Sequence, residues 1–109
     1  MQLPRKPNPR RSEEVGLSNQ LRRAAVAVAS NIAEGYGRTS KGEYVQFLGH
    51  ARGSIFEVQT QITIAQGLGY GTKESLGSAD SLAGEVGRML VSMLSKLRPS
   101  AHMRLGPNP

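Results

Sequence analysis

The stretch that decides the fold runs from Gln20 to Glu57 and reads QLRRAAVAVASNIAEGYGRTSKGEYVQFLGHARGSIFE. Its apolar residues recur at intervals of three and four, the spacing that places side chains on one face of an amphipathic helix. Glycines and polar residues interrupt this pattern between Gly35 and Ser40. The stretch is therefore typical of two helices joined by a short loop.

The first predicted helix begins at Ser18 and ends at Gly35, because glycine readily adopts the left-handed conformation of a helix cap. Its spacing of apolar residues predicts a single buried face. That face consists of Leu17, Leu21, Ala24 or Ala25, Val28 and Ile32.

The second predicted helix has the clearest start in the chain. Ser40 and Glu43 have the spacing of a capping box, in which each side chain satisfies a free backbone amide. The apolar steps that follow alternate between four and three, as in helices that pack with a shallow left-handed crossing. The expected seam is Tyr44, Leu48, Ala51, Ile55, Val58, Ile62 and Ala65.

A third helix is predicted after the glycines at positions 67, 69 and 71, with Thr72 as its cap. Pro99 closes it, since proline cannot continue a helix. The expected seam is Leu76, Ala79, Ala83, Val86, Leu90, Met93 and Leu97.

The sequence thus predicts an all-α protein, an antiparallel up-and-down helical bundle that occupies residues 16–98. Residues 1–15 contain three prolines among charged residues, so we expect a disordered or loosely held basic arm there. Residues 99–109 form a C-terminal tail. A chain of 109 residues with 38% apolar content has a modest core, so oligomerisation is expected.

The predicted hairpin resembles the bacterial four-helix bundle protein family over Gly16 to Tyr70. This family includes proteins encoded by intervening sequences in large-subunit ribosomal RNA genes, and it is related to the accessory variability determinant of diversity-generating retroelements. The resemblance implies a four-helix bundle that assembles as a homopentamer. It is carried by Arg22-Arg23-Ala24-Ala25, Ser30-Asn31-Ile32-Ala33-Glu34-Gly35, Gly37-Arg38, Phe47-Leu48, Ala51-Arg52-Gly53-Ser54 and Glu57.

The chain departs from that family at its start. Family members carry a further helix before the segment that matches Gly16, whereas only the proline-rich stretch 1–15 precedes it here. The first of four helices is therefore expected to be missing, which would expose an apolar groove. Either the true chain start lies further upstream, or a neighbouring chain covers the groove.

The net charge of +6 sits in the terminal segments. Residues 1–12 contribute +4 and residues 96–109 contribute +3, whereas residues 13–95 carry seven basic and eight acidic side chains. A basic arm can bind phosphates weakly, with strong salt dependence and without sequence preference. It can equally be a solvated tail that aids solubility, and the sequence leaves both readings open.

RNA or DNA is the leading expected ligand of the chain. With only five aromatic residues and no recognition-helix pattern, contact should be directed at the phosphate backbone. The alternative is a protein-interaction module that docks a partner helix without nucleic acid. The candidate contacts are Arg22, Arg38, Lys41 and Arg52 in the folded part, and Arg5, Lys6, Arg10 and Arg11 in the arm.

Other polar residues of the hairpin are predicted to stabilise the fold. Residues that face each other across the predicted turn include Arg23 and Glu57, which we expect to pair. Asn31 is expected to bond across the hairpin, and Glu34 is assigned a structural role with them.

Small residues on both predicted helices suggest a close approach. Glycine costs about 1 kcal/mol relative to alanine inside a helix, so another interaction must offset the cost of Gly49 and Gly53. A near approach of Ala25, Ala29 and Ala33 is one reason, and a ligand on bare backbone is another.

Catalysis finds little support in the sequence. The two histidines, His50 and His102, have no second metal ligand at useful spacing, and cysteine is absent. Neither a secretory signal nor a membrane-spanning apolar run is visible. We therefore expect a cytoplasmic, non-enzymatic protein without cofactor, metal or membrane partner.

Overall fold

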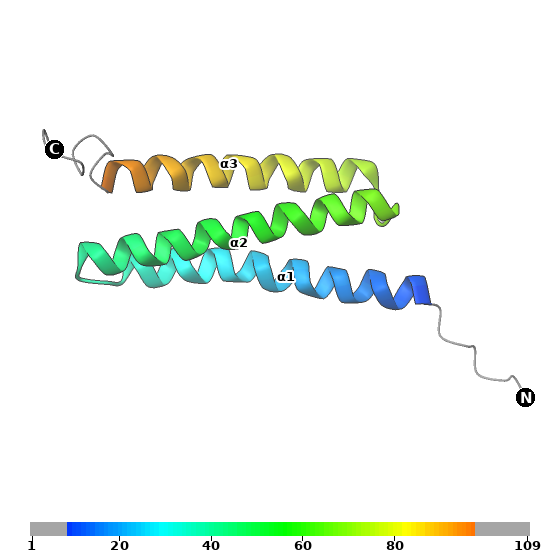
Figure 1. Ribbon diagram of the computed structural model, residues 1–109, viewed down its shortest axis with the longest axis horizontal. Helices are drawn as coiled ribbons and strands as arrows, with labels where there is room; N and C mark the ends of the chain where they lie inside the picture. Colours follow the sequence, from blue (N-terminus) through cyan, green and yellow to red (C-terminus); the bar gives the residue numbers. More distant parts are fainter. Residues whose placement is uncertain (1–8, 98–109) are drawn as a thin grey trace, which may run out of the picture.

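Three antiparallel helices make up the described part of the molecule (Figure 1). The computed structural model describes residues 9–97, with α1 at Pro9–Tyr36, α2 at Lys41–Leu68 and α3 at Lys73–Leu97. No strand occurs within this range, so the all-α prediction is confirmed. The middle helix, α2, packs against both neighbours, whereas no Cα atom of α1 lies within 8 Å of one in α3.

Helix α1 begins at Pro9 rather than at Ser18, so the prediction of a disordered arm is wrong for residues 9–15. Proline is well tolerated in the first turn of a helix, where its missing N–H would have no helical partner. Contacts with the α2–α3 loop, described below, hold this end of α1. The rest of the predicted arm, residues 1–8, lies outside the described residues.

The end of α1 also differs from the prediction. Gly35 does not adopt the left-handed conformation, and the helix continues to Tyr36. Gly35 is buried, and a Cβ atom there would lie 3.0 Å from both Phe47 Cβ and Tyr44 Cδ1. The glycine is therefore needed because α1 and α2 approach each other closely beside their turn.

The predicted boundaries of α2 are confirmed. Ser40 Oγ accepts a hydrogen bond of 3.0 Å from the Glu43 amide, and Gly69 closes the helix in the left-handed conformation at φ 73°. The predicted seam faces the core along its whole length, with Tyr44 half-buried and the others buried. These buried residues are Leu48, Ala51, Ile55, Val58, Ile62 and Ala65.

Helix α3 begins as predicted, because Thr72 Oγ1 accepts a hydrogen bond of 3.1 Å from the Ser75 amide. Ala83 and Leu90 of the predicted seam are buried and its other residues are half-buried. Leu94, which the seam omitted, is also buried. The core divides into two clusters along α2, one around Leu48, Ile55 and Leu90 and one around Val58 and Ile62.

The predicted close approach of small residues does not occur where it was expected. Ala25, Ala29 and Ala33 are all exposed. Gly53 is exposed too, and a Cβ atom there would have nothing within 4 Å, while Gly49 is half-buried. Close packing of the hairpin is concentrated at Gly35 instead.

Candidate nucleic-acid interface

Arg10, predicted as part of a flexible basic arm, belongs to a contact network that fixes the start of α1. Its guanidinium pairs with Glu14 at 3.1 Å and donates a hydrogen bond of 3.0 Å to the Gly69 carbonyl oxygen. Its Cζ atom lies 5.4 Å from the centroid of the Tyr70 ring. The guanidinium of Arg10 therefore links α1 to the α2–α3 loop.

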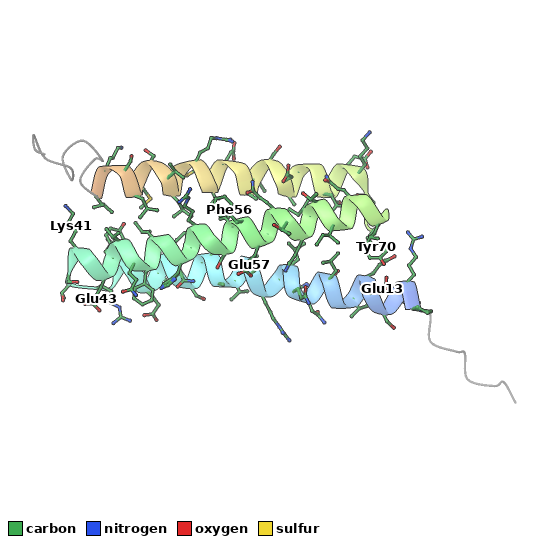
Figure 2. All side chains as sticks on the ribbon, in the orientation of Figure 1. Glu13, Lys41, Glu43, Phe56, Glu57 and Tyr70 are labelled. Carbon is green, nitrogen blue, oxygen red and sulfur yellow. The ribbon has the colours of Figure 1, made fainter. Side chains whose placement is uncertain are left out.

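Tyr70 completes this network at the same end of the molecule. Its hydroxyl donates a hydrogen bond of 2.6 Å to the Glu13 carboxylate, and Figure 2 places both side chains beside the start of α1. This hydrogen bond, together with burial, raises the pKa of Tyr70 above its ordinary value of 10.0. The cause is that an ionised phenol cannot donate and would be repelled by the Glu13 carboxylate.

Arg38, a predicted phosphate contact, lies in the α1–α2 turn, where the carboxylates of the two flanking helices neutralise its positive charge. Its guanidinium lies 2.9 Å from Glu34 and 3.9 Å from Glu43. Its Cζ atom is 4.8 Å from the centroid of the Phe47 ring. Arg38 therefore links Glu34 of α1 to Glu43 and Phe47 of α2, and little positive charge is left for a phosphate.

Two predicted interactions across the hairpin are wrong. Arg23 and Glu57 are both exposed, and neither appears in an ion pair within residues 9–97. Asn31 donates a hydrogen bond of 2.8 Å to the Ala27 carbonyl oxygen of its own helix rather than to α2. The hairpin is held by apolar packing along its length and by Arg38 at its turn.

Three other predicted contacts are exposed but far apart along the chain. Arg11 is near the start of α1, Arg22 is in its middle and Lys41 is the first residue of α2, where Figure 2 labels it. Arg5 and Lys6 lie outside the described residues. These cations do not form a cluster that could define a site.

Arg52, another predicted contact, lies in a shaped site. It lines a hollow of about 420 Å³ between α2 and α3, together with Phe56 of its own helix and Arg88 of α3. Phe56 is 52% exposed, and the Arg52 Cζ atom lies 5.1 Å from its ring centroid. In the described part of the chain, neither Arg52 nor Arg88 has a carboxylate partner.

Two glycines of α3 shape this hollow. A Cβ atom at Gly87 would lie 3.3 Å from Ile55 Cγ2, so the glycine lets α3 pack closely on α2. A Cβ atom at Gly84 would lie 3.3 Å from Arg88 Nη1. The Arg88 side chain therefore folds back along its own helix, over the space that Gly84 leaves open.

The sequence contains one local signal for this site, the spacing of its residues. Arg52 and Phe56 are four residues apart, as are Gly84 and Arg88, so each pair shares a helix face. Nothing local indicated that the two pairs would face the same hollow, because that depends on how α3 packs on α2. Phe56 and Arg88 were missed for this reason.

The chemistry of the hollow suits a ligand that combines negative charge with a flat apolar face. Guanidinium groups bind phosphate and carboxylate oxygens, often through two parallel hydrogen bonds. An exposed aromatic ring offers a stacking surface. His50, also on α2, is exposed and contacts Phe47 edge-to-face, at 6.1 Å between ring centroids.

A second, purely apolar depression lies on another face of the molecule. Leu82 and Met89 of α3 are 61% and 58% exposed, and Leu82 lines this depression. The depression, which we call the apolar groove, has a volume of about 320 Å³. It is lined by Leu21, Ala25, Val28, Ile55, Val58, Ile62, Ala79, Leu82, Ala83 and Val86.

Two further properties concern the described residues alone. No group of three or more histidine, aspartate or glutamate side chains among them could hold a metal ion. None of the three helices is both long and apolar enough to cross a membrane.

Comparison with known families agrees with this architecture. Residues 6–92 match the model of the family described as 23S rRNA-intervening sequence protein. No curated protein matches the chain. The family match includes all of α1 and α2 and most of α3, with both arginines of the hollow. The chain therefore belongs to the 23S rRNA-intervening sequence protein family.

Proposed function

We propose that the protein binds nucleic acid, weakly and with little sequence preference, as an oligomer and without catalytic activity. The observation that carries this proposal is the hollow between α2 and α3. Arg52 and Arg88 line it without a carboxylate partner among residues 9–97, beside the exposed ring of Phe56. Elsewhere in that range, Arg10 and Arg38 are paired with carboxylates.

Weak binding follows from the number and distribution of charges. Residues 13–95 carry one more acidic than basic side chain, so no long-range field draws a polyanion to the bundle. Attraction should come from the hollow and from the basic ends of the sequence, including Arg5, Lys6 and Arg11. Each phosphate that is neutralised releases counterions, so the affinity should fall steeply with salt.

The test is fluorescence anisotropy with labelled RNA and DNA oligonucleotides between low and moderate salt. We expect the double variant Arg52→Ala/Arg88→Ala to lower the slope of log affinity against log salt by about two. The matched control is Arg23→Ala, which removes an exposed arginine of α1 that has no ion pair. A loss in Arg23→Ala half as large as in the double variant, which is the same loss per arginine removed, would show that charge alone matters and would overturn the assignment to the hollow.

The oligomer is proposed from the apolar groove, whose lining residue Leu82 is largely exposed, and from the exposed Met89 on the same helix. A pentamer is what the family resemblance implies, and light scattering would count the subunits. We expect Leu82→Glu to reduce the solution mass, because a charge in a buried contact is costly. Ile64→Glu, at an exposed apolar position of α2 outside the groove, should leave the mass unchanged.

A protein-interaction module is the second candidate function, and the same groove favours it. Its apolar lining could accept the apolar face of a partner's amphipathic helix. A chain that stays monomeric and ignores nucleic acid at low salt would support this alternative over the nucleic-acid reading.

A further inference from the structure

We propose that the hollow selects an unpaired base of a single strand, with Phe56 as the stacking surface and the two arginines as ligands of the neighbouring phosphates. This inference rests on the proposed function and deepens it, because it names the form of nucleic acid that the site takes. It begins from Phe56, a large aromatic side chain that remains 52% exposed beside a hollow of about 420 Å³.

The surroundings of Phe56 distinguish it from an ordinary exposed apolar residue. The Arg52 guanidinium lies over the ring, with its Cζ atom 5.1 Å from the centroid. A guanidinium plane and an aromatic ring are the two surfaces on which proteins stack unpaired bases. Ile55 and Val91 add an apolar wall to the same hollow.

A duplex cannot use this combination fully. In a duplex each base face is covered by its neighbours, so the protein meets mainly phosphates and groove edges. Phosphates could still contact Arg52 and Arg88, but Phe56 would remain without a partner. The hollow should therefore bind a single strand more tightly than a duplex, and the difference in binding free energy should equal the contribution of one stacked base.

The position of Arg88 allows the nucleic acid to be bound from both helices. Its side chain folds back over Gly84, with Nη1 only 3.3 Å from where a Cβ atom would stand. The second guanidinium thus comes from α3 while Arg52 and Phe56 come from α2. A strand that places its base on Phe56 would have a cation available from each helix for the phosphates on either side.

The experiment compares a labelled single-stranded RNA with a duplex of the same length at one moderate salt concentration. We expect Phe56→Leu to weaken single-strand binding about tenfold, the effect of losing one base–aromatic stack, and to leave duplex binding unchanged. Phe56→Tyr should retain the preference because its ring can still stack. The matched control is Tyr36→Leu, since Tyr36 is an aromatic residue that is 85% exposed outside the hollow.

A spectroscopic readout tests stacking directly. A single strand with one 2-aminopurine base should show quenched fluorescence on binding to the wild type and to Phe56→Tyr, but not to Phe56→Leu. Circular dichroism would establish that each variant folds, which is expected because Phe56 is half exposed.

The possible failures are distinguishable. If Phe56→Leu weakens both probes equally or neither, the single-strand inference is wrong, while a loss in Arg52→Ala/Arg88→Ala would still support the proposed function. If an acidic polyglutamate peptide binds as well as single-stranded RNA, the site recognises charge alone and the inference is overturned. If neither nucleic acid binds, both proposals fail together.

Discussion

The α1–α2 turn and the α2–α3 hollow contain the same pair of side-chain types with opposite electrostatic settings. In the turn, Arg38 lies 4.8 Å from the Phe47 ring centroid and is compensated by two glutamates. In the hollow, Arg52 lies 5.1 Å from the Phe56 ring centroid without any carboxylate partner in the described range. The two arginines differ in their acidic neighbours and not in their aromatic contact. Those neighbours decide whether the arginine stabilises the fold or is available to bind a ligand.

The largest expected effect concerns the packing at the turn. Gly35→Ala should lower the free energy of unfolding by about 1–2 kcal/mol, because its Cβ atom would press on the rigid Phe47 Cβ atom at 3.0 Å. Gly53→Ala is the control, with nothing within 4 Å of its new Cβ atom. It should raise stability by about 0.5–1 kcal/mol through helix propensity. Urea denaturation measures both, and a stabilised Gly35→Ala protein would show that the turn can relax.

Substitutions of Arg38 and Arg52 should have opposite effects, one on stability and the other on binding. Arg38→Ala should cost about 0.5–1 kcal/mol of stability, a modest amount because both of its ion pairs are substantially exposed, and should leave oligonucleotide affinity unchanged. Arg52→Ala should weaken binding without changing the melting temperature. Thermal melts and anisotropy on both variants provide the crossed comparison. A loss of affinity in Arg38→Ala as large as in Arg52→Ala would erase the distinction between the two regions.

A smaller effect is expected from Gly84→Ala, which changes the hollow without removing a charge. The new Cβ atom would stand 3.3 Å from Arg88 Nη1 and would displace a flexible side chain. Affinity for a single strand should fall about threefold, which corresponds to a loss of about 0.7 kcal/mol in binding free energy. Gly77→Ala, on the same helix and with nothing within 4 Å, is the control. Unchanged affinity in Gly84→Ala would mean that the folded-back position of Arg88 is irrelevant to binding.

The smallest effect involves Tyr70, which belongs to the third arginine–aromatic contact, beside Arg10. Because the pKa of Tyr70 is raised in the folded protein, its stabilising contribution is complete below pH 10 and is lost as the pH rises through the folded pKa. Alkaline absorbance titration should show a tyrosine ionisation step above pH 10 that belongs to Tyr70. That step should disappear in Tyr70→Phe. If the variant keeps the step above pH 10, the displaced ionisation does not belong to Tyr70, and the Glu13 hydrogen bond is contradicted.

The helix seams were predictable because their signals are local. Ser40, Glu43 and Thr72 indicate helix starts, and the apolar spacing of α2 gives its buried face without knowledge of its neighbours. The start of α1 was not predictable in this way. Its first turns are held by Gly69 and Tyr70, far away in the sequence, so tertiary contacts extend the helix beyond its local signals.

The candidate site was only partly predictable. Arg52 was selected for its charge, but the same reasoning selected Arg10 and Arg38, which are paired. For Arg38 the i,i+4 spacing to Glu34 was a usable signal of compensation. Arg88 and Phe56 come together only through the packing of α3 on α2, which no local pattern specifies.

The separation of the α1 and α3 backbones, which have no Cα pair within 8 Å, has a consequence for how the molecule opens. The backbone of α3 approaches only α2, whereas α1 is also held at its start by Gly69 and Tyr70, so α3 could detach while the α1–α2 hairpin stays folded. Amide hydrogen exchange should then form a graded pattern, slowest in the middle of α2 and faster in both outer helices. A protein of this kind could release α3, and with it one half of the hollow, without losing the α1–α2 hairpin.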